Sequence, residues 1–172
     1  MLRLLSEILK LPLVSSQSGS PIGRLTGYLV DPATGVIAAY VTKVDGQTRY
    51  LSTVDVLRYY DNAVLVSEPA VLQELDELVR VKRLVEERIE LFGLRVVDQE
   101  SARLGSIHDC LVHSVGHYLA RLYVKPPLLT RLISDERIIP REHIVSISQK
   151  EVIVRYDMKA QAPAAEPEIP LT

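Results

Sequence analysis

The densest group of side chains that could do chemistry is His108, Asp109, Cys110, His113 and His117. Imidazole and thiolate are typical zinc ligands, and a cysteine beside a histidine can act as a nucleophile with its base. The spacing argues against both. In a strand, side chains alternate, so His108 and Cys110 share one face and Asp109 points to the other. The other two histidines fall in or beyond a turn, so we expect no metal, cofactor or catalytic residue.

Other patterns with chemical meaning are weaker. Gly23 and Gly27 lie in a strand-like segment, and no Gly-Lys-Ser/Thr follows them, so they do not form a phosphate-binding loop. Paired carboxylates at 76–77 and 86–87 occur in a charge-rich stretch and are best explained as solvated. We therefore expect a protein that is not an enzyme, with a metal- or thiol-dependent enzyme as a remote alternative.

The chain contains an internal repeat. An offset of 82 aligns residues 21–30 with 103–112 and places Gly23 on Gly105. Later in the repeat the offset becomes 88, which places Leu51 on Ile139. A repeated unit of this length indicates two copies of one small fold. We therefore divide the chain into a first copy (1–68), a connector (69–92), a second copy (93–157) and a tail (158–172).

Short segments with period-two alternation predict the strands of each copy. In the segment 23–30, Leu25, Gly27 and Leu29 should share one face, and Arg24, Thr26 and Tyr28 the other. A second strand covers 36–44, and the Asp45-Gly46 pair that follows is typical of a two-residue hairpin turn. Gly35 should supply a positive φ before that strand; its counterpart glycine in the second copy lies one place earlier. The spacing predicts a mainly β fold with two small antiparallel β-barrels in tandem.

The connector has a helical pattern. Apolar residues recur there at three- and four-residue intervals, at Val71, Leu75, Leu78, Val85, Ile89 and Phe92. Lys82 interrupts this stripe, so both one long helix and two shorter helices remain open. This connector could also pair two copies of the chain as a homodimer. The tail is rich in Pro, Ala and Glu without periodicity, and we expect it to be disordered.

Composition limits the classes of function. The 172 residues are 47% hydrophobic and 24% charged, which is typical of a globular protein. Residues 1–68 carry six basic and six acidic side chains, and 94–157 carry nine and eight. Neither copy has the basic excess typical of nucleic-acid binding. A single cysteine fits a reducing cytoplasm, and no stretch approaches the roughly 18 apolar residues of a membrane span.

The largest difference between the copies is an insertion at 125–136, which replaces the hairpin of the first copy. Pro126-Pro127 can start a short helix that presents apolar side chains on one face: Leu128, Leu129, Leu132 and Ile133. These four residues are the candidate partner-binding site. The alternative is that they pack against their own barrel or the connector.

The sequence resembles the PRC-barrel family. In the second copy the resemblance rests on Leu91-Phe-Gly93-Leu-Arg-Val96, Gly105-Ser-Ile107-His-Asp109-Cys-Leu-Val112 and Ile138-Ile139-Pro140-Arg-Glu-His-Ile144. The first copy departs from these motifs at Lys10, Gly27 and Ser52. The resemblance implies small β-barrels that dock other proteins and carry no catalytic residues. It also implies a structural role for Asp109, which we expect to bind backbone N–H groups near the turn.

Taken together, these features predict a cytoplasmic, non-enzymatic protein-interaction or scaffold module with another protein as its partner. Because the family includes a domain of a ribosome-maturation factor, a ribosome- or RNA-assembly factor is the main alternative. The near-neutral charge of both copies makes nucleic acid the less favoured partner.

Overall fold

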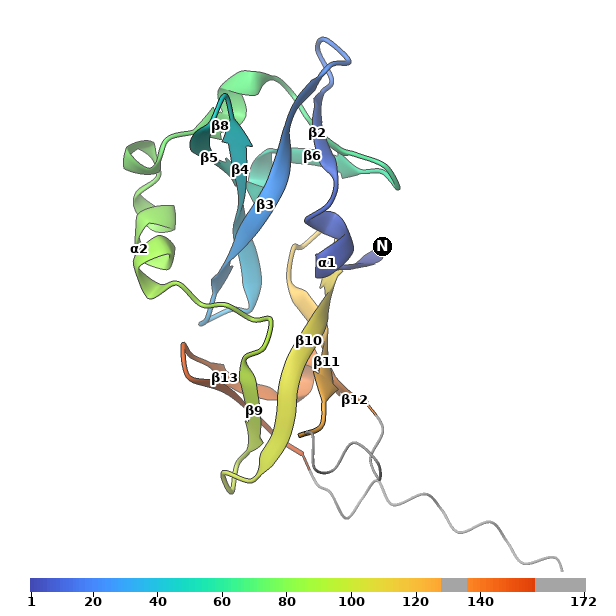
Figure 1. Ribbon diagram of the computed structural model, residues 1–172, viewed down its shortest axis with the longest axis vertical. Helices are drawn as coiled ribbons and strands as arrows, with labels where there is room; N and C mark the ends of the chain where they lie inside the picture. The colour runs from blue at the N-terminus through green and yellow to red at the C-terminus, as the bar shows by residue number, and fades with distance from the viewer. Residues whose placement is uncertain (128–135, 157–172) are drawn as a thin grey trace, which may run out of the picture.

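The computed structural model describes residues 1–127 and 136–156, which form a mainly β protein with two sheets (Figure 1). The first sheet contains β2 Pro12–Ser15, β3 Pro21–Asp31, β4 Val36–Val44, β5 Gln47–Ser52, β6 Val56–Tyr59, β7 Val64–Val66 and β8 Leu72–Gln73. The second sheet contains β1 Leu2–Leu4, β9 Arg95–Asp98, β10 Arg103–His113, β11 Leu119–Lys125, β12 Arg137–Pro140, β13 Ile144–Ile147 and β14 Glu151–Val154. In the described ranges, no helix is both long and apolar enough to cross a membrane.

The two sheets repeat one strand order. The first runs β6-β7-β2-β3-β4-β5-β8, and the second runs β13-β14-β9-β10-β11-β12. Each contains one parallel pair at the same place, with Leu13 opposite Val64 and Val96 opposite Val152. Registers in the hairpins also correspond, because Tyr40 faces Leu51 and Leu122 faces Ile139. The offsets of 82 and 88 therefore describe equivalent positions in space.

The long strands β3 and β10 carry a β-bulge at equivalent places. In β3 the register shifts between Leu25 and Gly27, so Thr26 is the extra residue; in β10 it shifts around His108. A bulge reverses the face of every later side chain. Tyr28 consequently joins Leu25 in the main core, while Leu29 packs in a separate cluster. The expected alternation along 23–30 is therefore wrong beyond Thr26.

The turns agree in part with expectation. Asp45 and Gly46 both have positive φ, 50° and 79°, as a two-residue hairpin turn of this type requires. Gly35 has φ 67° after β3. In the second copy the equivalent conformation falls on His117, with φ 53°, and not on the nearby Gly116. Histidine is among the residues that tolerate the left-handed region better than branched ones.

The connector is neither one long helix nor two. It contains 3₁₀ turns at Pro69–Val71 (η2) and Leu75–Glu77 (η3), the short strand β8 between them, and one α-helix, α2 Val79–Glu87. Strand β8 forms because Leu72 and Gln73 pair with the edge strand β5. Helix α2 ends at Arg88, which has φ 39°. Residues beyond it, including Ile89, continue as an extended segment packed into the core.

The two copies exchange their leading segments. Strand β1 and helix α1 Leu5–Ile8 pack on β10 of the second sheet, although they precede the first sheet in sequence. Helix α2, which precedes the second sheet, packs on β3 of the first. Residues of both sheets accordingly share one core cluster. Two further 3₁₀ turns in the described ranges are η1 Thr53–Asp55 and η5 Arg141–His143.

A symmetric backbone bridge joins the sheets. Val36 at the start of β4 pairs antiparallel with Tyr118 before β11. On either side, Ile37 N donates to His117 O at 2.7 Å, and Leu119 N donates to Gly35 O at 2.8 Å. The two bonds are equivalent, because the offset of 82 places Ile37 on Leu119 and Gly35 on His117. The two copies therefore meet as the subunits of an isologous dimer do, around a local two-fold axis.

Candidate functional site

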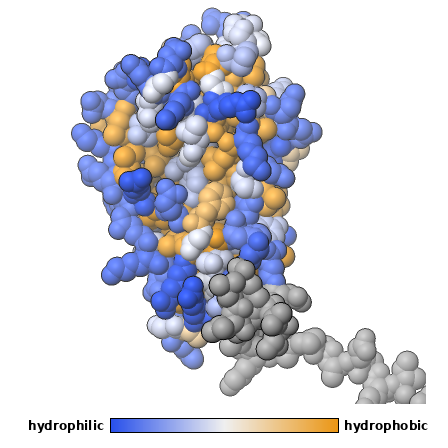
Figure 2. All heavy atoms as spheres, in the orientation of Figure 1, coloured by the Kyte–Doolittle hydropathy of each residue, from blue (hydrophilic) through white to orange (hydrophobic). Residues whose placement is uncertain are grey.

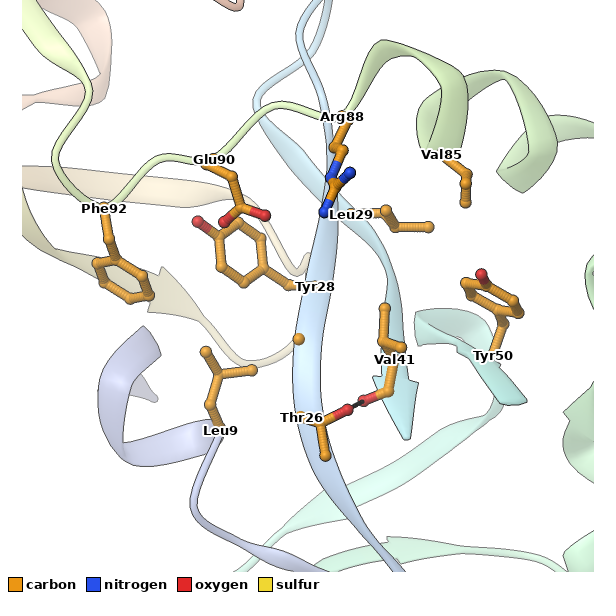
Figure 3. Close-up of a pocket in the computed structure, with 11 residues that line it drawn as sticks. Leu9, Thr26, Tyr28, Leu29, Val41, Tyr50, Val85, Arg88, Glu90 and Phe92 are labelled. Carbon is orange, nitrogen blue, oxygen red and sulfur yellow. Dashed lines mark hydrogen bonds between the residues drawn. The ribbon is translucent and has the colours of Figure 1, made fainter. Parts of the chain in front are cut away.

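A groove lies over the middle of β3, between the first sheet, α2 and the segment that leads to β9. It has a volume of about 450 Å³. It is lined by Leu9, Thr26, Gly27, Tyr28, Leu29, Val41, Tyr50, Val85, Arg88, Glu90 and Phe92, which we call the junction groove. Figure 3 shows Leu9 and Phe92 at one side of β3 and Tyr50 with Val85 at the other. Apolar residues are visible in the middle of this face, between polar margins (Figure 2).

The floor of the junction groove depends on the β3 bulge. Thr26 turns outward there, and its hydroxyl donates to Val41 O at 3.2 Å. The neighbouring Gly27 has no side chain, so the backbone of β3 is open to the groove; a Cβ at this position would lie 3.4 Å from Val41 Cβ. The exposed backbone and the small residue together create the depth of the groove.

Tyr28 connects the floor to the far wall. Its hydroxyl accepts a hydrogen bond from Leu91 N at 2.8 Å, and its ring meets Phe92 edge-on at 5.7 Å. Burial raises the pKa of Tyr28 well above its usual value, the Leu91 N–H partly offsets this, and the charge of Glu90 adds to the rise. A phenol held in this way stays neutral and serves as an anchor, not as a base.

The rim of the groove carries two charges. Arg88 follows the last turn of α2, Glu90 lies two residues later, and Figure 3 shows both side chains above Tyr28. Within the described residues, neither side chain forms an ion pair. The junction groove thus combines aromatic and aliphatic side chains with the charges of Arg88 and Glu90, a composition that is typical of protein-interaction sites.

The histidine and cysteine cluster does not converge. The bulge at His108 places that residue at the surface and directs Cys110 into the core, so the two do not share a face as expected. His108 Nε2 instead lies 2.5 Å from Glu136 Oε1. Across the described ranges, no group of three or more His, Cys, Asp or Glu side chains could hold a metal ion. Burial raises the pKa of the Cys110 thiol strongly, which opposes thiolate formation.

Asp109 has a structural role that differs from the expected one. Its carboxylate accepts hydrogen bonds from Ser6 N at 3.2 Å, Ser6 Oγ at 2.5 Å and Cys110 N at 2.7 Å. The carboxylate thus holds α1 on the second sheet and does not bind backbone groups of the turn. His113 stacks on Tyr118, with the ring centroids 5.0 Å apart.

His117 belongs to a small network at the bridge between the sheets. Its Nδ1 lies 3.1 Å from the Tyr59 hydroxyl, which donates to the Tyr40 hydroxyl at 3.0 Å. Burial raises the pKa of Tyr59 to about 12 and, together with the nearby His113, lowers the pKa of His117. The network is therefore neutral at physiological pH and links the two copies through uncharged hydrogen bonds.

The predicted partner-binding residues Leu128, Leu129, Leu132 and Ile133 lie outside the described residues. The sequence analysis missed the junction groove because its residues come from five separate segments. One signal was present: Tyr28 and Phe92 are large aromatic residues in a chain with few of them. No known family model matches the sequence, and no curated protein matches it either.

Proposed function

We propose that the protein is a non-enzymatic interaction module built from two PRC-type barrels in tandem. The repeated strand order supports this proposal, because a duplicated small fold explains it directly. The parallel pairs β2–β7 and β9–β14 add further support, since they stand at the same place in the two strand orders. In a small barrel the interior is filled by side chains, which leaves binding to outer surfaces.

The observation that carries the function is the junction groove. It is lined by Leu9 just after α1, by residues of the first sheet, by α2 and by the segment leading to β9, so its shape depends on how the connector packs on the first copy. Tyr50 and Phe92, which are both partly exposed, offer aromatic contact area, which dominates the energetics of protein interfaces. Arg88 and Glu90 can orient a partner through charge. A segment of another protein that places an apolar side chain against Tyr50 fits this groove.

The groups in the groove favour binding over catalysis. Tyr28 is held neutral by burial and is occupied by the Leu91 N–H, so it is a poor proton acceptor. Cys110, the single thiol of the chain, is buried on the other sheet. A scaffold needs neither group to react.

Affinity capture with matched variants tests the proposal. Tyr50→Ala removes an aromatic wall of the groove, and Tyr60→Ala removes an exposed tyrosine outside it. We expect wild-type protein and Tyr60→Ala to retain the same bound proteins from native lysate, and Tyr50→Ala to lose them. Both variants should melt close to wild type. Equal capture by all three proteins, measured by quantitative mass spectrometry, would remove the junction groove as the docking site.

A further inference from the structure

Two further grooves lie beside the 3₁₀ turns η1 and η5. The groove of the first sheet, about 570 Å³, runs between β4, η1 and the start of α2. The groove of the second sheet, about 530 Å³, runs between β11, η5 and β1. Their floors correspond through the repeat, with Val36, Ala38 and Ser52 in the first and Tyr118, Ala120 and Pro140 in the second. The duplication has thus produced two related grooves.

The two grooves have diverged in charge. The position of Asp31 in the first copy is occupied by His113 in the second, and that of Thr53 by Arg141. Ala39, which pairs with Ser52, corresponds to Arg121, which pairs with Pro140. The second groove, which we call the cationic groove, therefore gains three basic side chains. Glu142, in place of Val54, is the acidic residue that lines it.

The three basic side chains of the cationic groove differ in their contacts with the rest of the protein. The Arg141 guanidinium lies 4.6 Å from the Tyr118 ring centroid, and its Nη2 donates to Thr34 O at 2.9 Å. His113 Nδ1 accepts from the backbone N–H groups of Val115 and Gly116, so Nε2 carries the proton of the neutral ring. Arg121 is exposed and makes no ion pair or side-chain hydrogen bond with the described part of the chain.

We propose that the cationic groove binds an acidic segment of a partner protein. Two arginines that line one groove suit carboxylates, because a guanidinium can donate two parallel hydrogen bonds to one carboxylate. Leu2, which is 45% exposed at the edge, offers an apolar contact beside them. Glu142 disfavours a continuous polyanion such as nucleic acid, since one phosphate would face its charge. This binding site is separate from the junction groove.

Fluorescence anisotropy tests the proposal with the full chain and a short fluorescein-labelled peptide of glutamate and leucine. We expect Arg121→Gln to weaken binding by about tenfold, because one charge-assisted interaction is lost. Arg141→Gln should weaken it at least as much. Arg80→Gln, in the related groove of the first copy, is the matched control and should leave binding unchanged. Since Arg121 makes no such contact, its variant should keep the wild-type melting temperature.

Three outcomes would overturn the proposal. The first is equal binding by a peptide with lysine in place of glutamate. The second is unchanged affinity in both Arg121→Gln and Arg141→Gln. The third is stronger binding by a single-stranded RNA of mixed sequence that displaces the peptide, which would assign the groove to nucleic acid. Tyr50→Ala should not affect peptide binding, so failure of the junction groove and failure of the cationic groove are distinguishable.

Discussion

The two sheets differ in what covers them at the bulges of β3 and β10. Gly27 of β3 corresponds to Asp109 of β10. In the second sheet, the Asp109 carboxylate is 8% exposed and fastens α1 through Ser6. In the first sheet, Gly27 leaves the strand uncovered and the junction groove lies above it. One backbone thus supports a sealed contact in one copy and an open groove in the other.

Asp109 and Gly27 thus give the two copies different contacts with the segments that cover them. The second copy has a buried carboxylate at this position. The first copy has a glycine there, and its covering segment is held by the Tyr28 hydroxyl instead. Where no side chain of the strand binds the covering segment, a groove can form between the two. Substitutions at equivalent positions of the two copies measure how much these contacts differ in energy.

The largest difference is expected at the pair Gly105 and Gly23. Gly105 has φ 149°, and an added Cβ would lie 2.0 Å from Lys125 O. At Gly23 the nearest atom is the Thr42 hydroxyl oxygen, at 2.9 Å, and φ is not positive. We expect Gly105→Ala to cost at least about 4 kcal/mol, because backbone must move, and Gly23→Ala clearly less. Urea unfolding measures both, and equal losses would show that the two strand positions do not differ in the strain that an added Cβ causes.

The next effect concerns the carboxylate itself. Asp109→Ala leaves the part-buried N–H and hydroxyl of Ser6 and the buried N–H of Cys110 without their acceptor, and the free energy of unfolding should fall by about 3 kcal/mol. Hydrogen exchange at Ser6 should accelerate, because α1 loses its attachment to β10. Gly27→Ala at the equivalent place should cost under about 1 kcal/mol, since Val41 is in ordinary contact distance. If the two variants lose equal stability, the sealed and open contacts do not differ in energy.

A smaller loss is expected at the anchor of the first sheet. Tyr28→Phe keeps the ring but removes the acceptor of the Leu91 N–H, which should cost about 1 kcal/mol. Tyr50→Phe is the matched control, because its hydroxyl makes no hydrogen bond with the described residues. Chemical denaturation compares the two. A Tyr50→Phe loss as large as that of Tyr28→Phe would show that the hydroxyl of Tyr28 does not hold the segment 89–92.

Much of the backbone could be predicted from the sequence, because its signals are local. The Asp45-Gly46 turn follows from the φ values that only certain residues adopt, and the repeat follows from identities at a fixed offset. The mainly β character follows from alternation in short segments. The helical connector was overestimated, because apolar spacing in 69–78 serves contacts with the edge of the first sheet and not a continuous helix.

The grooves could not be predicted, because they depend on contacts between distant segments. The bulges at Thr26 and His108 invert the faces of Tyr28 and Cys110, and nothing in strict alternation reveals an extra residue. A signal existed in the spacing of Ile107, Cys110 and Val112, which are all buried but are not two apart throughout. The exchange of α1 and α2 between the sheets also had no local signature.

The smallest expected effect is a difference in pH dependence between Gly35 and His117, the equivalent turn residues at the bridge between the sheets. Gly35 cannot titrate, whereas its counterpart His117 has a pKa lowered by burial and by His113. Because the folded protein binds this proton less readily than the unfolded chain, stability from His117 is complete above a pH of about 6.5 and falls as the pH drops below it. His117→Asn tolerates the same φ and removes the titration. Melting temperatures between neutral and acidic pH should therefore fall by less in His117→Asn than in wild type. If the melting temperatures of the two proteins fall equally with pH, a group other than His117 causes the acid sensitivity.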